Sequence, residues 1–123
     1  MAGKIVALVD DLFFLAKIQE TAKAIGVTLL KVDQRLGPCS IAEAQPLAII
    51  LDLGSRSLPV LDWIRSLKAE DGTKSIRIVG FVSHVEGQLI ADAKSAGCDA
   101  VMARSAFTQQ LPNLLRSFAA ESK

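Results

Sequence analysis

The chain has few aromatic residues, few cysteines and almost no net charge. It contains five Phe, one Trp and no Tyr, while 50% of its 123 residues are hydrophobic. A packed core would therefore be mostly aliphatic, as in parallel sheets covered by helices. Its 14 basic and 13 acidic residues give a net charge of +1, which offers no electrostatic argument for a nucleic acid or an anionic membrane as partner.

Three further absences narrow the class of protein. No apolar run approaches the ~20 residues of a membrane span, and no signal peptide precedes the first apolar run. Cys39 and Cys98 are the only cysteines, and neither has a His or Cys at metal-ligand spacing. We therefore expect reduced thiols in a cytoplasmic protein. The length fits one domain over residues 1–123.

Five short apolar runs alternate with segments that have helical spacing of apolar residues. The runs predict strands over Lys4–Val9, Val27–Val32, Leu47–Leu53, Ile76–Val82 and Ala100–Ala103. The intervening patterns predict helices over Phe13–Ile25, Ser40–Ala44, Pro59–Ala69, Glu86–Ala96 and Phe107–Ala120. Gly26 and Gly97 stand where C-terminal caps belong. Regular alternation of this kind predicts an α/β fold, a doubly wound five-stranded parallel sheet with helices on both faces.

Polar side chains follow four of the five predicted strands. Asp10 and Asp11 close the first strand, and Asp52 lies near the end of the third. Ser83 follows the fourth strand and Arg104 the fifth. In an open parallel sheet, ligands bind outside the carboxyl ends of the strands where the strand order reverses. The sequence therefore predicts that these side chains converge around one acidic pocket.

The three carboxylates predict a site for a hard cation and a phosphoryl group. They would repel one another, and Mg²⁺ with oxygen ligands removes that cost. An aspartate beside such an ion can act as the nucleophile toward a phosphoryl group, with Ser83 and Arg104 donating hydrogen bonds to its oxygens. Each residue also has an ordinary interpretation: Asp11 as a helix N-cap and Arg104 as a solvated surface residue. Asp52 is the hardest to dismiss, because it interrupts an apolar strand.

Four segments together resemble the receiver domains of two-component response regulators, with this chain as a divergent member. They read KIVALVDD, LAIILDL, GFVS and AGCDAVMARSAF. The resemblance implies a (βα)5 flavodoxin-like fold in which Asp52 accepts a phosphoryl group from a histidine kinase or phosphotransfer protein. It implies Mg²⁺ as the cofactor, with Asp10, Asp11, Asp52 and Gly54 as metal-binding residues, and Ser83 as the switch hydroxyl. Output would pass through the face made by the fourth helix, the fifth strand and the fifth helix, with a homodimer through this face as one option.

The chain departs from the family pattern around the same site. Arg104 stands where the family usually has Lys, and the two are not equivalent. Ser105 replaces the Pro that follows, so we expect a trans bond or a reshaped loop there, since a cis bond before a non-proline residue costs ~2.5–4 kcal/mol. Val101 replaces the switch aromatic, and residues 54–57 replace Met-Pro after the phosphoacceptor. His84 takes the place of a small residue, and its bulk could obstruct the pocket.

Three hypotheses therefore stay open. The first is a phosphorylatable stand-alone receiver, a switch rather than an enzyme. The second is a degenerate receiver that acts as a protein-interaction module, with a docking or dimer surface made by Val101, Phe107 and Leu111. The third is another α/β function such as nucleotide binding, which the lack of any GxGxxG or GxxxxGK[ST] loop disfavours.

Overall fold

Five parallel strands form one sheet in the computed structural model, which describes residues 3–31, 41, 43, 45–54, 59–83 and 87–121. The strands are β1 (Lys4–Leu8), β2 (Thr28–Lys31), β3 (Ala48–Asp52), β4 (Arg77–Val82) and β5 (Ala100–Ala103). Their order in the sheet is β2-β1-β3-β4-β5, and every neighbouring pair is parallel. The direction of winding therefore reverses between β1 and β3.

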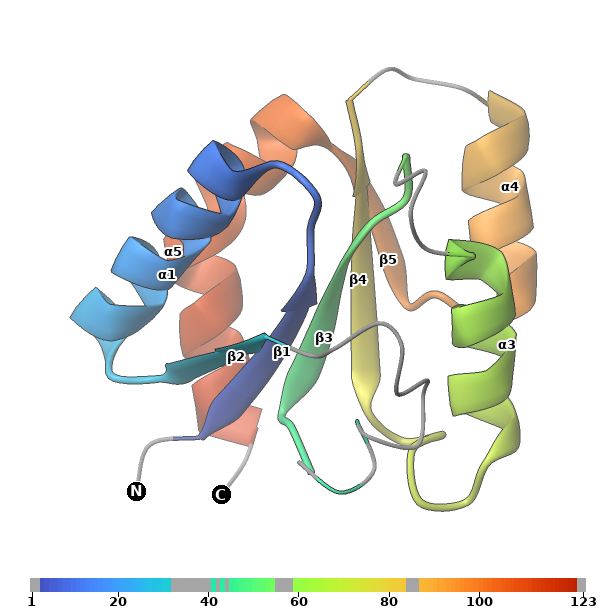
Figure 1. Ribbon diagram of the computed structural model, residues 1–123, viewed down its shortest axis with the longest axis horizontal. Helices are drawn as coiled ribbons and strands as arrows, with labels where there is room; N and C mark the ends of the chain where they lie inside the picture. The colour runs from blue at the N-terminus through green and yellow to red at the C-terminus, as the bar shows by residue number, and fades with distance from the viewer. Residues whose placement is uncertain are drawn as a thin grey trace.

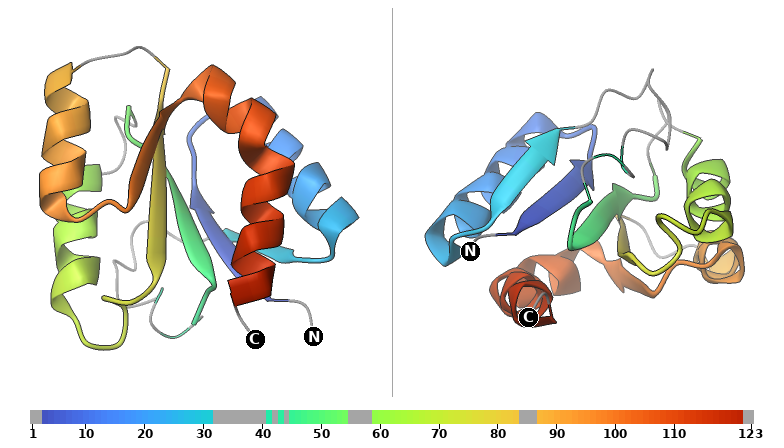
Figure 2. Two further views of the ribbon diagram at one scale, coloured as in Figure 1. Left: turned by 180° about the vertical axis from the view of Figure 1, so that it is seen from behind. Right: turned by 90° about the horizontal axis from the view of Figure 1, so that it is seen from below.

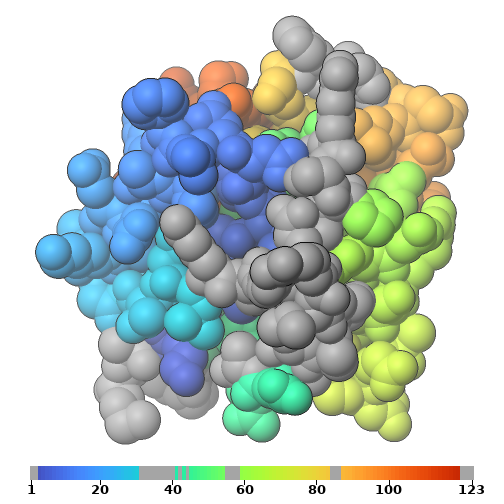
Figure 3. All heavy atoms as spheres, in the orientation of Figure 1, coloured from blue at the N-terminus to red at the C-terminus, as the bar shows by residue number. Residues whose placement is uncertain are grey.

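Helices cover both faces of the sheet. They are α1 (Leu12–Ile25), α3 (Val60–Ala69), α4 (Gly87–Ala96) and α5 (Arg104–Glu121). Figures 1 and 2 show α1 and α5 on one face and α3 and α4 on the other. Figure 3 shows the view of Figure 1 with atoms as spheres, in which α1 forms the upper left and α3 and α4 the right. The predicted fold class, a doubly wound parallel α/β sheet, is confirmed.

Apart from the residues at their ends, the strands are apolar because each face of the sheet has its own core. In β3, Ala48 and Ile50 belong to the first core, between the sheet and α1 and α5. Ile49 and Leu51 belong to the second core, between the sheet and α3 and α4. All four side chains are 0% exposed. A parallel strand buried on both faces reads as a continuous hydrophobic run, which is why β3 was the clearest strand in the sequence.

The first core corrects one prediction about a docking surface. Phe107 and Leu111 are 0% and 1% exposed and lie in the first core. They therefore cannot form an interaction surface, because the first turns of α5 turn these side chains toward the sheet. Val101 is partly buried and packs against the second core.

The residues that cap the helices lie at the predicted positions. Gly26 follows α1 with φ +96°, and Gly97 follows α4 with φ +119°. Both values lie in the left-handed region that glycine adopts without a steric penalty. At the other end of α1, Asp11 is the N-cap residue, with φ −76° and ψ 109°.

Two boundaries matter for the site. The strand ends lie within one residue of the predicted ones, but α5 begins at Arg104 rather than at Phe107. Residues 104–106 contain no Gly or Pro, so the helix can start directly after β5. The predicted helix at 40–44 lies mostly outside the described residues, although Ile41 is fully buried in the second core. Within the ranges described, no helix is both long and apolar enough to cross a membrane.

Candidate functional site

The carboxyl ends of the strands bring the predicted acidic residues to one edge of the sheet, the upper edge in Figure 1. Asp10 follows β1 and is exposed, Asp11 caps α1, and Asp52 is the last residue of β3. We call these three residues the acidic rim. They lie where the winding of the sheet reverses between β1 and β3, as the rule for open α/β sheets predicts.

Both carboxylate oxygens of Asp11 accept hydrogen bonds. Oδ1 accepts from the backbone N–H groups of Phe13 at 3.0 Å and Phe14 at 3.2 Å, which caps the first turn of α1. Oδ2 accepts from Nη2 of Arg104 at 2.6 Å. The Arg104 hydrogen bond, followed by that from Phe14, holds the pKa of Asp11 below its ordinary value. Asp11 thus has the predicted capping role and also a charged partner.

Arg104 is held by a second contact besides Asp11. Its guanidinium carbon lies 4.2 Å from the centroid of the Phe14 ring, within the range of a cation–π interaction. The Phe14 ring is 4.9 Å from that of Phe81 and 5.9 Å from that of Phe107. These aromatic rings belong to the first core, so Arg104 rests on a fixed platform at its edge. Stacking on a ring uses the planar shape of the guanidinium, which Lys lacks.

The surroundings of Asp52 raise its pKa, whereas those of Asp11 lower it. Partial burial raises its pKa, and the backbone N–H of Gly54, which donates to Oδ1 at 3.0 Å, opposes that effect. The charge on Asp10 raises the pKa further, Arg104 lowers it and Asp11 raises it. Charges of both signs at this edge of the sheet thus shift the pKa of Asp52, with burial as the largest cause.

The remaining predicted site residues divide into two groups. Ser83 is exposed directly after β4, at the same edge of the sheet as Asp52. His84 and residues 55–57 lie outside the described residues, so the predicted obstruction by His84 is not tested. No described peptide bond is cis, and the Arg104–Ser105 bond is trans as expected.

The ligand types at three positions suit a hard cation, while the carboxylate at a fourth position already has a cationic partner. Carboxylates of Asp10 and Asp52 and a backbone carbonyl at Gly54 are the ligand types that Mg²⁺ accepts. Asp11 is engaged by Arg104 and by the α1 cap. Among the residues described, no three His, Cys, Asp or Glu side chains are placed together as a metal-binding group.

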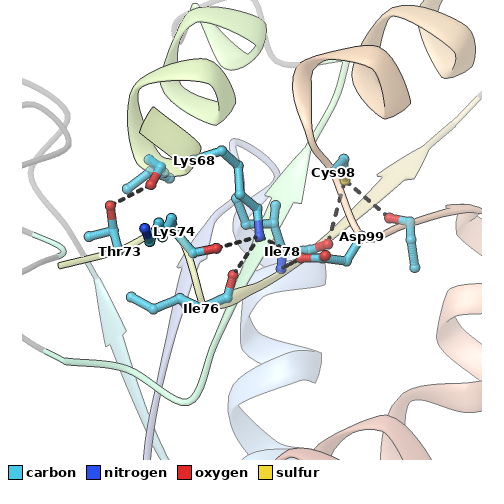
Figure 4. Close-up of polar contacts among 9 residues, drawn as sticks. Lys68, Thr73, Lys74, Ile76, Ile78, Cys98 and Asp99 are labelled. Carbon is cyan, nitrogen blue, oxygen red and sulfur yellow. Dashed lines mark hydrogen bonds and ion pairs between the residues drawn. The ribbon is translucent and has the colours of Figure 1, made fainter. Parts of the chain in front are cut away.

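Sequence reasoning missed the Arg104–Asp11 ion pair and a second polar cluster. The second cluster lies at the opposite end of the strands, where β4 and β5 begin (Figure 4). Lys68 Nζ donates to Asp99 Oδ2 at 2.9 Å, and the same oxygen accepts from the backbone N–H of Ile78 at 2.7 Å. Its one sequence signal was the Asp of the AGCDA segment.

The described cysteine, Cys98, is a free, buried thiol as expected, and burial raises its pKa. Cys39 lies outside the described residues.

No protein-family model matches the chain, and no curated protein matches it. Solved structures do match over nearly the whole length. A response regulator from Hahella chejuensis aligns with a TM-score of 0.84 at 18% identity, covering 95% of each chain. The chain has the receiver fold. This conclusion confirms the fold that the resemblance implied.

Two further structures with the receiver fold extend the comparison. The receiver domain of a sensor histidine kinase from Pseudomonas aeruginosa has a TM-score of 0.82 at 16% identity, covering 98% of this chain and 99% of that one. It holds a magnesium ion in its active site cleft. The chemotaxis response regulator CheY4 of Vibrio cholerae has a TM-score of 0.80 at 14% identity, covering 96% and 99%. At such identities the likeness establishes the fold, and the chemistry of this chain depends on its own residues.

Proposed function

We propose that the chain is a receiver domain in which Asp52 accepts a phosphoryl group. The observation that carries this proposal is the position of Asp52 at the edge of the sheet where Asp10, Asp11 and Arg104 also lie. A partly buried carboxylate at the end of the central strand β3 is a suitable nucleophile. It forms a bond from Oδ to phosphorus while the bond from phosphorus to the donor histidine nitrogen breaks and its electron pair stays on that nitrogen.

The neighbouring residues have supporting roles in this proposal. Asp10, Asp52 and the Gly54 carbonyl hold Mg²⁺, with Asp11 as a further ligand when it is released from Arg104. A bound Mg²⁺ would neutralise negative charge on the phosphoryl oxygens. The exposed Ser83 hydroxyl donates a hydrogen bond to a phosphoryl oxygen, and the guanidinium of Arg104 supplies a charged one. The signal then passes through the α4–β5–α5 face, where a homodimer could also form.

The partner in this proposal is a protein phosphodonor, a histidine kinase or a phosphotransfer protein. Leu12 and Phe13 are 70% and 91% exposed in the first turn of α1. They directly follow Asp11, so an apolar surface adjoins the acidic rim, where a protein partner would bind. The near-neutral charge supports neither nucleic acid nor a membrane as partner. We propose a cytoplasmic switch rather than an enzyme.

A second candidate function follows from the Arg104–Asp11 ion pair at 2.6 Å. In this alternative the chain keeps the receiver fold as a protein-interaction module and does not take up phosphate. The ion pair favours it because Arg104 balances the charge of one of the three rim carboxylates without a metal.

Incubation with acetyl phosphate and Mg²⁺, followed by intact-mass measurement, separates the two functions. We expect the parent chain to gain the mass of one phosphoryl group and Asp52→Asn to gain none. The matched control is Asp62→Asn, which removes an exposed carboxylate on α3 that pairs with Arg65. It should be labelled like the parent. No label on the parent at saturating Mg²⁺ would favour the interaction module.

A further inference from the structure

The Asp11 carboxylate already has the donors that a bound ion would have to replace. Two backbone N–H groups donate to Oδ1, and the Arg104 guanidinium donates to Oδ2. A divalent cation that binds Asp11 through Oδ2 would compete with the guanidinium for the negative charge of this carboxylate, and the two cations would repel each other. Two cations thus compete for one carboxylate.

Arg104 is anchored independently of Asp11, so it is not an arm that swings freely in solvent. The Phe14 ring lies under its guanidinium at 4.2 Å. As the first residue of α5, its backbone is fixed by the helix, and its carbonyl accepts a hydrogen bond from the Thr108 hydroxyl at 2.8 Å. Only 34% of its side chain is exposed. Less conformational entropy is lost when a side chain held in this way pairs with Asp11, which strengthens the competition.

We infer that Arg104 is a built-in counter-ion that lowers the affinity of the acidic rim for divalent cations by competing for Asp11. The same residue opens α5, so uptake of an ion at the rim would remove the hydrogen bond between the first residue of α5 and the N-cap residue of α1. This inference rests on the proposed metal site but does not require phosphorylation of Asp52.

Mg²⁺ titration by calorimetry tests the inference without any phosphoryl transfer. Arg104→Gln removes the charge while keeping a polar side chain, and we expect its Kd for Mg²⁺ to fall at least about tenfold, equivalent to about 1.4 kcal/mol. Arg104→Lys keeps the charge but loses the planar stacking, so its Kd should lie between those of the parent and Arg104→Gln. Arg116→Gln, which changes an exposed arginine on α5, is the matched control and should leave the Kd unchanged.

A second readout reports on Arg104 itself. In the folded parent chain, the side-chain Nε–Hε resonance of Arg104 should move during the Mg²⁺ titration, with the midpoint seen for the Gly54 backbone amide. A purely structural arginine would not move with that midpoint.

Three results would overturn the inference. The first is an Arg104→Gln variant that is folded, by circular dichroism, and binds Mg²⁺ no more tightly than the parent. The second is an Arg104 resonance that stays fixed while Mg²⁺ binds. The third is the absence of Mg²⁺ binding in both proteins. The mass experiment on Asp52 is decided separately, because it scores phosphorylation whatever the Arg104 variants do.

Discussion

Replacing the half-buried Lys68 by Met should destabilise the protein more than the same change at the exposed Lys74. The Lys68 ammonium joins the end of α3 to the segments that precede β4 and β5 (Figure 4). It donates to the carbonyl oxygens of Lys74 at 3.2 Å and Ile76 at 3.0 Å, and to Oδ2 of Asp99 at 2.9 Å. The Lys68 side chain is 20% exposed, so its ammonium is more shielded from water than those of ordinary surface lysines, although Asp99 is 43% exposed.

The magnitude follows from counting these contacts. A hydrogen bond to a charged group contributes about 1.5–3 kcal/mol when buried, but an exposed ion pair contributes only about 0.2–1 kcal/mol. The Asp99 side chain is 43% exposed, so the ion pair counts toward the lower end. The two carbonyl contacts are exposed and part-buried, so we count each at about 1 kcal/mol, below the range for buried ones. Together with the ion pair, they give an expected loss in the free energy of unfolding of about 2–3 kcal/mol. Met retains the apolar stem, so the comparison isolates the ammonium group.

Urea denaturation followed by the fluorescence of the buried Trp63 measures this loss as a lower midpoint at an unchanged slope. The control is Lys74→Met, because the Lys74 ammonium pairs at 3.0 Å with Asp71 on the surface, where the two side chains are 58% and 96% exposed. Its effect should stay within about 0.5 kcal/mol. If Lys68→Met cost no more than Lys74→Met, the reasoning about the shielded network would be wrong.

Three other substitutions test the neighbourhood of the site. Gly80→Ala should lower the free energy of unfolding by about 1–3 kcal/mol, because an added Cβ would lie 2.8 Å from the buried Leu53 side chain. In the same urea denaturation assay Gly72→Ala should have little effect, because a Cβ at Gly72 would have no atom within 4 Å. Because the pKa of Asp52 is raised, ionisation of this carboxyl lowers the free energy of unfolding at pH values above its ordinary pKa of 3.8. Asp52→Asn should therefore raise the melting temperature at neutral pH, and this gain should disappear at about pH 3, where the carboxyl is protonated in both the folded and the unfolded state; an undiminished gain would contradict the shift. Phe13→Ser should change the free energy of unfolding by less than about 0.5 kcal/mol and leave labelling by acetyl phosphate intact, yet slow transfer from a histidine phosphotransfer protein; equal slowing with both donors would argue against docking at Phe13.

The sheet could be predicted from the sequence because its strands are buried on both faces. The strand Ala48–Asp52 is a continuous apolar run up to its last residue, which is typical of a strand buried on both faces. Gly26 and Gly97 mark helix ends, because their left-handed backbone conformation is one that few other residues adopt. The rule that parallel strands end at one edge then placed the acidic residues and Arg104 at the same rim. The local pattern of apolar residues and the rules of sheet topology were therefore sufficient to predict most of the fold.

The contacts within the rim could not be predicted in the same way. No local pattern indicated that Arg104 donates to Asp11 and stacks on Phe14. Which acid an arginine reaches depends on side-chain torsions and on where α5 begins, and that start was misplaced by three residues, at Phe107 rather than Arg104. The Lys68–Asp99 pair joins residues 31 positions apart, a separation on which a local pattern carries no information.

Chemical trapping of the labelled residue is the most direct test of the proposed chemistry. After incubation with acetyl phosphate and Mg²⁺, borohydride reduces an aspartyl phosphate to homoserine, and peptide mass mapping then locates the altered residue. We predict homoserine at position 52 and at no other aspartate of the chain. Reduction at Asp10 or Asp11 instead, or an unaltered Asp52 at saturating donor and Mg²⁺, would contradict the assignment of Asp52 as the phosphoacceptor.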